Sequence, residues 1–126
     1  MTRVLATRHV LAIKDLASVT DYFVRVLGFR RDFSVEGWEF LSLDEFQVML
    51  GECIDDVTAY ETKNHSYFAH VLVDNVNALF ESMKSNGASF SEEIADKRWG
   101  VREFFVVTPE GHRIGFAQSI ERGQVT

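Results

Sequence analysis

Cysteine is almost absent from this chain: Cys53 is the only one among 126 residues. The chain can therefore form no disulfide within itself and no cysteine-based metal cluster. Long hydrophobic runs are missing as well, and no segment reaches the length of a membrane-spanning helix or of the apolar part of a signal peptide. These scarcities argue against a secreted disulfide scaffold and against a helical membrane protein, and we expect a cytoplasmic protein.

Proline is equally scarce, with Pro109 alone, and no low-complexity stretch separates two parts of the chain. We therefore predict one domain over residues 1–126. No block of like charge occurs, although the formal net charge is −6. An acidic chain repels phosphate backbones, so nucleic acid is not an expected partner, and the charge favours a cationic small molecule.

Two segments, 18–27 and 75–86, carry apolar residues at helical spacing, and a glycine follows each. Asp15 and Asp74 are the expected N-caps of these helices. In most of the remaining chain, apolar and polar residues alternate or apolar residues follow one another over short lengths, a pattern typical of β-strands. The predicted strands are 8–14, 30–36, 38–43, 46–51, 67–74, 101–107 and 112–119.

The chain repeats itself at a spacing of about sixty residues. RHVLAIKDLASVTDYFVRVLGF and FAHVLVDNVNALFESMKSNGA each read as a strand, a short connection, a helix and a glycine, and a hairpin follows each. We predict an α+β fold of two tandem βαβββ modules, at about 7–52 and 66–120, which form a cup-shaped mixed sheet with the helices outside.

Hairpin pairing predicts which side chains turn away from the helices. A two-residue loop at Asp44-Glu45 pairs Trp38 with Gly51 and Phe40 with Met49. The face predicted to be free of helices carries Arg8, Trp38, Phe40, Gln47, Met49, Phe68, His70, Arg102, Phe104 and Arg113. Aromatic walls with a few polar groups are typical of a pocket for an organic ligand. Equally, these aromatic residues could fill a core between two sheets.

Trp99 lies in a predicted loop, next to Gly100 and between Arg98 and Arg102. An aromatic side chain flanked by cations suits stacking on a planar ligand. The same residue type is common at subunit contacts, and it could also plug the cup. Both interpretations remain open from sequence.

Three segments resemble the vicinal-oxygen-chelate superfamily, which includes glyoxalase I, extradiol dioxygenases and the fosfomycin- and bleomycin-resistance proteins. They are the two repeated module openings and the closing hairpin WGVREFFVVTPEGHRIGFAQ. The stretch DKRWGVREF followed by TPEGHR is most similar to bleomycin-resistance-type members. The resemblance covers nearly the whole chain and implies the duplicated fold, whereas fold alone does not imply activity.

The metal-dependent members of this superfamily hold a divalent ion with His, Gln and Glu at equivalent points of both modules. The resemblance places Arg8, Met49, Phe68 and Gly115 at those points, and none of them is a plausible ligand for such an ion. His70 lies two residues beyond Phe68, and a single histidine does not make a metal site. We therefore expect no metal and no cofactor.

The resemblance and the missing ligands together predict a metal-independent binding protein, similar to the antibiotic-resistance members, that sequesters a small organic ligand, planar or cationic. It also implies a homodimer. The predicted ligand-binding residues are Arg8, Trp38, Phe40, Met49, Phe68, His70, Trp99, Arg102 and Phe104, and we predict no catalytic residue.

Two alternatives remain. The chain could be a metal-dependent glyoxalase-like or dioxygenase-like enzyme whose ligands are displaced, with His70 joined by Glu39 or Glu103. It could also be a regulatory or interaction partner whose cup is only a core. Whether the protein is an enzyme stays open at this point.

Overall fold

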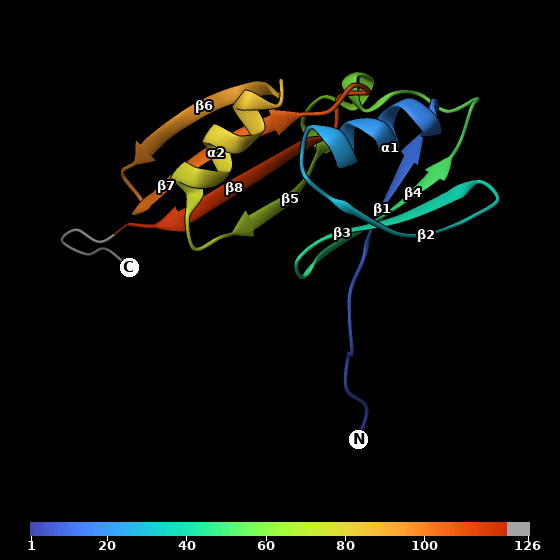
Figure 1. Ribbon diagram of the computed structural model, residues 1–126, viewed down its shortest axis with the longest axis horizontal. Coiled ribbons are helices and arrows are strands. Elements are labelled where there is room, and N and C mark those ends of the chain that lie inside the picture. Colours follow the sequence, from blue (N-terminus) through green and yellow to red (C-terminus); the bar gives the residue numbers. More distant parts are fainter. Residues whose placement is uncertain (121–126) are drawn as a thin grey trace.

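A computed structural model of the chain describes residues 1–120, and the last six residues of the predicted domain lie outside them (Figure 1). Within residues 1–120 no helix has both the length and the apolar character needed to cross a bilayer. The elements of this range are β1 His9–Ile13, α1 Leu16–Arg25, β2 Arg30–Val35, β3 Trp38–Leu43, β4 Phe46–Glu52, a 3-10 segment Ala59–Ser66, β5 Tyr67–Leu72, α2 Val76–Ser85, β6 Ser89–Lys97, β7 Val101–Val107 and β8 Arg113–Ser119.

The strands form two four-stranded mixed sheets with the same topology. Module 1 has the order β1-β4-β3-β2, and module 2 has the order β5-β8-β7-β6. In each module the first and last strands pair in parallel, and the other neighbours pair antiparallel. The α+β fold and its duplication are therefore confirmed.

The helices begin at side-chain caps. Asp15 Oδ1 accepts a hydrogen bond from the backbone N–H of Ser18, as the sequence predicts. At α2 the cap is Asn75, whose Oδ1 accepts from the N–H of Ala78, and the prediction of Asp74 is wrong by one residue. Asn75 directly precedes Val76, the first residue of α2, and its side chain therefore reaches the free N–H of Ala78.

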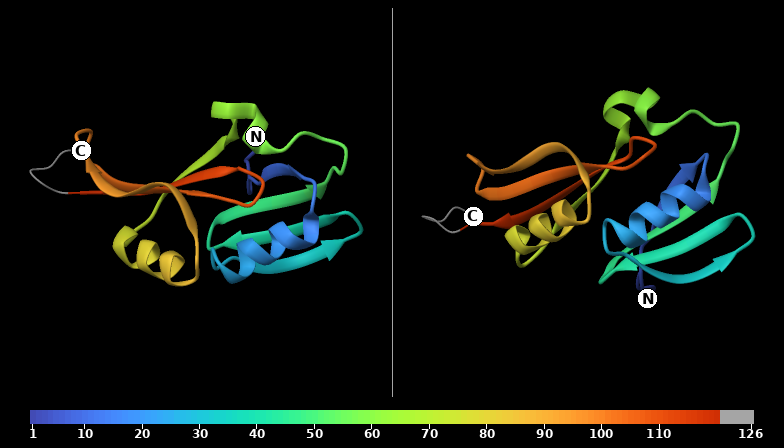
Figure 2. Two further views of the ribbon diagram at one scale, coloured as in Figure 1. Left: turned by 90° about the horizontal axis from the view of Figure 1, so that it is seen from above. Right: turned by 45° about the horizontal axis from the view of Figure 1, so that its top comes forward.

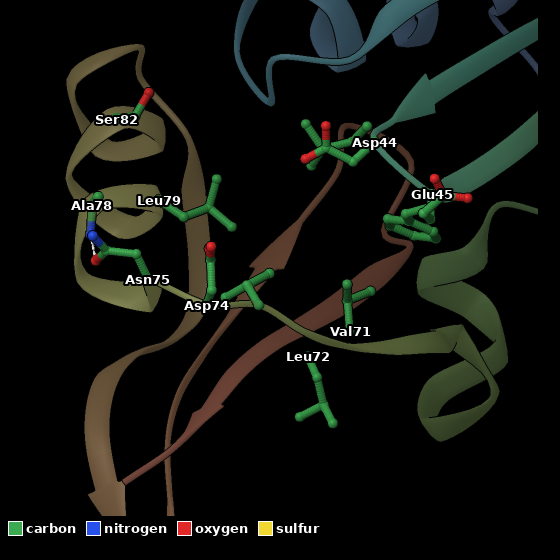
Figure 3. A pocket seen from close by; sticks show the side chains of 12 residues that line it. Asp44, Glu45, Val71, Leu72, Asp74, Asn75, Ala78, Leu79 and Ser82 are labelled. Carbon is green, nitrogen blue, oxygen red and sulfur yellow. Dashed lines mark hydrogen bonds between the residues drawn. The ribbon is translucent and has the colours of Figure 1, made fainter.

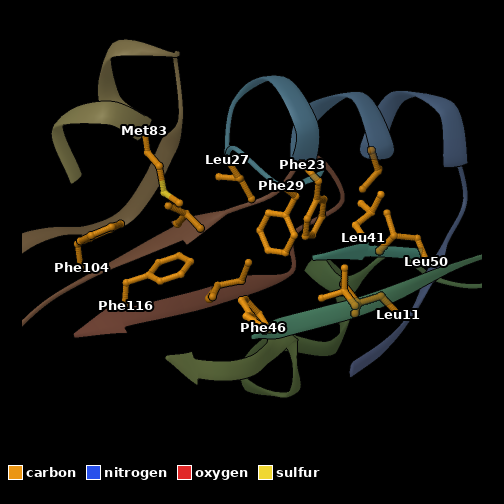
Figure 4. Packing of buried hydrophobic residues seen from close by; sticks show 14 of the residues in the cluster. Leu11, Phe23, Leu27, Phe29, Leu41, Phe46, Leu50, Met83, Phe104 and Phe116 are labelled. Carbon is orange, nitrogen blue, oxygen red and sulfur yellow. The ribbon is translucent and has the colours of Figure 1, made fainter. Parts of the chain in front are cut away.

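Both helices lie on the same side of the two sheets (Figure 2). One continuous core lies beneath them (Figure 4). Phe23 of α1 packs in it with Phe29, and Phe104 and Phe116 fill it under α2. Phe46 joins the two halves, since its ring centroid lies 6.4 Å from that of Phe116. The opposite faces of both sheets carry no helix.

Polar contacts fix the two modules to each other. The carboxylate of Glu110, in the β7–β8 loop, accepts hydrogen bonds from the backbone N–H groups of Lys14 and Asp15 at 2.8 and 2.7 Å. The hydroxyl of Tyr22 on α1 accepts from the N–H of Ser89 at the start of β6. Burial raises the pKa of Tyr22 above its usual range. The module junction is therefore a packed interface with its own hydrogen bonds.

The second hairpin departs from the prediction by one residue. The predicted strands 101–107 and 112–119 leave a turn at 108–111, which would pair Val107 with His112, but the observed pair is Val107 and Arg113. The loop has five residues and is closed by the N–H of Thr108, which donates to the carbonyl of His112. Because strand side chains alternate, this single residue exchanges the two faces of β7.

Candidate functional site

Module 1 presents a sheet face that no helix covers, and we call it the first open face. It follows from the predicted pairing, since Leu43 pairs with Phe46 across the Asp44-Glu45 loop. The aliphatic residues of β3 and β4 pack under α1, and the alternate residues turn outward. The first open face carries Arg8, Val10, Phe33, Val35, Trp38, Phe40, Gln47 and Met49.

Trp38 and Gly51 are cross-strand partners on this face. A β-carbon at residue 51 would lie 2.7 Å from Cζ3 of the indole. The absence of a side chain at Gly51 therefore lets the indole lie flat across β4. A half-buried indole in this position offers one broad surface to a flat ligand.

A second aromatic group lies further along the same face. The rings of Phe33 and Phe40 stack with centroids 4.2 Å apart and an angle of 13° between their planes. The guanidinium of Arg8 lies 5.6 Å from the centroid of Phe40. These residues border a cavity of about 340 Å³.

The rim of this cavity is charged. Arg30 Nε donates to Asp32 Oδ1 at 2.8 Å, and the Ser42 hydroxyl donates to the same oxygen. The hydrogen bond from Arg30 holds the pKa of Asp32 below its usual range. The first open face thus combines aromatic walls with a fixed carboxylate and two arginines, which can orient a polar organic molecule.

Module 2 presents the second open face, and its residues differ from those predicted. His70 is on it, and Phe105 lies beside His70 with ring centroids 6.2 Å apart. Nε2 of His70 lies 2.9 Å from Oε1 of Glu103. The guanidinium of Arg113 stacks over Tyr67 at 3.7 Å. The second open face carries Tyr67, His70, Leu72, Glu103, Phe105, Arg113 and Gly115.

Three predicted residues are not on this face. Phe104 is 0% exposed and packs edge-on against Phe80 of α2, because the five-residue loop exchanges the faces of β7. Arg102 shares that side with Phe104 and bonds Asp96 at 2.6 Å. Phe68 falls on a β-bulge, where the pairing shifts between Tyr67 and Ala69. It packs into the module junction against His9 and Phe46.

Trp99 lies in the turn between β6 and β7 and is 60% exposed. The ammonium of Lys97 lies 5.9 Å from its ring. Most of the indole is therefore open to solvent. The loop position predicted from sequence is confirmed, and the ligand role remains a prediction.

The positions at which metal-dependent relatives hold an ion do not fit one here. The Arg8 cation faces Phe40, and Phe68 is turned into the junction. A β-carbon at Gly115 would lie 2.5 Å from Cε2 of Phe105. Glu39, suggested as a displaced ligand, is held by Arg31 and Ser34 in module 1. Residues 1–120 bring no three His, Cys, Asp or Glu side chains together as an ion site.

A larger cavity, of about 590 Å³, lies on the helix side at the module junction (Figure 3). The Asp44-Glu45 loop of module 1 borders it on one side, and α2 with the end of β5 borders it on the other. Leu43, Val71 and Leu79 are among its apolar walls. Sequence reasoning missed this cavity because its walls come from two modules whose docking no local pattern predicts.

Comparison with known proteins identifies a family model and solved structures that are similar to this chain. A sequence model of the Glyoxalase/Bleomycin resistance protein/Dioxygenase superfamily matches residues 6–116. The crystal structure of TioX from Micromonospora sp. ML1 is 26% identical, with a TM-score of 0.72 over 91% of this chain and 98% of that chain.

Two further solved structures share the fold at lower identity. The bleomycin-binding protein from bleomycin-producing Streptomyces verticillus, solved with copper(II)-bleomycin, is 19% identical, with a TM-score of 0.73 over 95% of this chain and 100% of that chain. A glyoxalase/bleomycin resistance protein/dioxygenase from Alicyclobacillus acidocaldarius is 15% identical, with a TM-score of 0.79 over 91% of both chains. No curated protein matches the sequence.

Proposed function

We propose that this chain, which belongs to the Glyoxalase/Bleomycin resistance protein/Dioxygenase superfamily, binds a planar, cationic organic molecule without a metal and thereby sequesters it. The observation that carries the proposal is the first open face. There, Trp38 and the stacked pair Phe33 and Phe40 remain accessible beside Arg8 and the Asp32 carboxylate. Broad aromatic surfaces with few oriented polar groups favour a flat ligand.

Charge favours the cation. The chain has a net charge of −6, which attracts cations over a range of about 10 Å at 0.1 M salt. The solved relative from Streptomyces verticillus is itself a bleomycin-binding protein, which agrees with a binding role for this fold. Residues that cannot coordinate a divalent ion occupy the positions at which metal-dependent relatives hold one, and this supports binding without a metal.

The enclosed site requires a second subunit in this proposal. Neither open face is covered within residues 1–120, and Val10 and Leu72 are 64% and 69% exposed on their outer surfaces. A homodimer that opposes the first open face of one subunit to the second open face of its partner would bury both faces and enclose a ligand between them. Exposed apolar sheet faces of this kind are typical of subunit contacts.

Tryptophan fluorescence tests where the ligand binds. The Trp99→Phe variant keeps only Trp38 as a reporter, and Trp38→Phe keeps only Trp99. A planar cation such as acridine orange should quench Trp38 in the first variant. Phe40→Ala should weaken this binding about tenfold, the loss expected for one aromatic contact. Ala78→Leu, which narrows the junction cavity, serves as the matched control and should leave affinity unchanged.

The outcomes separate the candidate sites. Weakened binding in Ala78→Leu with an unchanged Phe40→Ala would move the ligand to the junction cavity and overturn the proposal. Stoichiometric zinc, nickel, iron or manganese in purified protein, together with loss of binding after chelation, would overturn metal independence.

Sedimentation velocity tests the dimer. Val10→Asp places a charge on the first open face. It should give monomers with weaker ligand binding, because burying an unpaired charge in a subunit contact costs desolvation free energy. Asn77→Asp on the exposed surface of α2 is the control and should stay dimeric. A monomeric wild-type protein that still binds would remove the second subunit from the site.

A further inference from the structure

Glu103 is a buried acid on the second open face. It is 5% exposed, whereas Phe105, the next residue of β7 on that face, is only partly buried. Its Oε1 atom lies 2.9 Å from Nε2 of His70, and the histidine side chain is half exposed. A buried carboxylate requires a hydrogen-bonding partner, and His70 supplies it. The pair is thus built into the sheet.

The pair fixes where the histidine proton lies. A carboxylate in its ionised form can only accept hydrogen bonds, and Nε2 of His70 is then the atom that donates to Glu103. In the neutral ring the other nitrogen, Nδ1, is then a free acceptor. Among residues 1–120 Nδ1 of His70 has no hydrogen-bonding partner. An oriented acceptor is therefore available on an exposed surface.

Aromatic rings surround this acceptor. Phe105 lies next to His70, and Tyr67 meets Phe105 edge-on with centroids 5.2 Å apart. Gly115 lies beneath them, and a β-carbon there would come within 3.0 Å of Cδ2 of His70. The missing side chain at Gly115 keeps room for the imidazole between the two strands. The surface thus combines one acceptor with apolar walls.

The geometry points to a recognition role for His70 and Glu103: Nδ1 of His70 accepts a hydrogen bond from an N–H or O–H group of the ligand, while Glu103 holds the required tautomer. The inference rests on the proposed binding function and narrows the ligand class to aromatic molecules that carry a donor, such as a protonated amine. Glu103 acts through His70 and is a positioning residue. The negative charge beneath the imidazole strengthens the acceptor, as second-layer carboxylates do for other histidines.

Nitrogen-15 NMR of the histidine rings at pH 8, above the usual pKa of histidine, tests the tautomer directly. We expect His70 to show a proton on Nε2 and a bare Nδ1. Glu103→Gln should allow both tautomers, because an amide can donate as well as accept. Glu92→Gln is the matched control, since Glu92 bonds Lys97 instead, and it should leave the His70 spectrum unchanged. A proton on Nδ1 of His70 in the wild-type protein would overturn the inference.

Three naphthalene probes test the recognition: 2-naphthylmethylammonium, which donates hydrogen bonds, 2-methoxynaphthalene, which only accepts them, and 2-naphthoate. We expect the ammonium probe to bind about tenfold more tightly than the methoxy probe, the gain of one charge-assisted hydrogen bond. His70→Phe should abolish this difference and leave the methoxy probe bound.

The failures are distinguishable. Equal binding of the ammonium and methoxy probes, or an unchanged preference in His70→Phe, would overturn the role of His70 and leave the binding function standing. Tighter binding of 2-naphthoate would show that His70 donates and would also overturn it. No binding of any probe at the open faces would contradict the binding function itself.

Discussion

The indole of Trp38 lies across Gly51 of the neighbouring strand, so close that a β-carbon at residue 51 would meet the ring at 2.7 Å. Only the far edge of the indole is touched, and the indole is only partly buried. Gly51→Ala should therefore displace the ring and not the backbone. We expect a change of less than about 1 kcal/mol in the free energy of unfolding.

The same variant should alter what Trp38 reports. In the Trp99→Phe background, Gly51→Ala should shift Trp38 emission to longer wavelength and weaken binding of a planar cation, because the flat surface is lost. Emission and affinity identical to those of the parent would show that Gly51 does not set the position of the indole.

Phe104 and Phe105 are adjacent in sequence, but their replacement by alanine should have different effects on stability and ligand binding. Phe104 is fully buried beneath α2, so Phe104→Ala should lower the free energy of unfolding by about 3–5 kcal/mol. Phe105 is half-buried on the second open face, and Phe105→Ala should cost about 1 kcal/mol while weakening ligand binding. Urea titrations of both variants check this, and a reversed order would contradict the five-residue loop.

Glu110 ties the β7–β8 loop to the start of α1. Glu110→Ala leaves the N–H groups of Lys14 and Asp15 without their acceptor, and we expect a loss of about 2–3 kcal/mol of unfolding free energy. Glu93→Ala removes an exposed carboxylate of equal charge and serves as the control. A loss of the same size in both variants would mean that charge, and not the double hydrogen bond, is responsible.

His112 should make stability depend on pH. Burial lowers its pKa below the usual value, while the Glu110 charge acts in the opposite direction. The unfolded chain therefore binds the proton more readily, and stability falls as pH drops below about 6.5 towards the folded pKa.

Unfolding midpoints at pH 8 and pH 5.5 test this. His112→Gln should lose less stability across the interval than the wild type. His65→Gln changes an exposed histidine and should behave as the wild type does. An unchanged pH dependence in His112→Gln would assign the effect to other groups.

The first open face could be predicted from the sequence because a two-residue loop leaves one pairing. Asp44 and Glu45 fix the register, and the predicted partners of Trp38 and Phe40 are those observed. The prediction of the second face failed at β7, where a proline-containing loop of four or five residues satisfies the same pattern. The five-residue loop has its own hydrogen bond from the N–H of Thr108 to the carbonyl of His112, and contacts of Glu110 with Lys14, Asp15 and Tyr60, which are distant in sequence, hold it in place.

The bulge at Phe68 is a second feature that could not be predicted from the sequence. Its side chain leaves the strand alternation because the module junction offers His9 and Phe46 as packing partners. These residues are more than twenty positions away in sequence, so no local periodicity reports them. The pairing of His70 with Glu103 and the junction cavity depend on the same long-range docking.

Gly115 also constrains how this protein could change over generations. Phe105 occupies the space that a side chain at residue 115 would need. A mutation that gives residue 115 the carboxylate of a chelating relative would push the Phe105 ring out of that space. Residues 105 and 115 therefore change the second open face together, and a smaller residue at position 105 would make a side chain at position 115 easier to accept over generations.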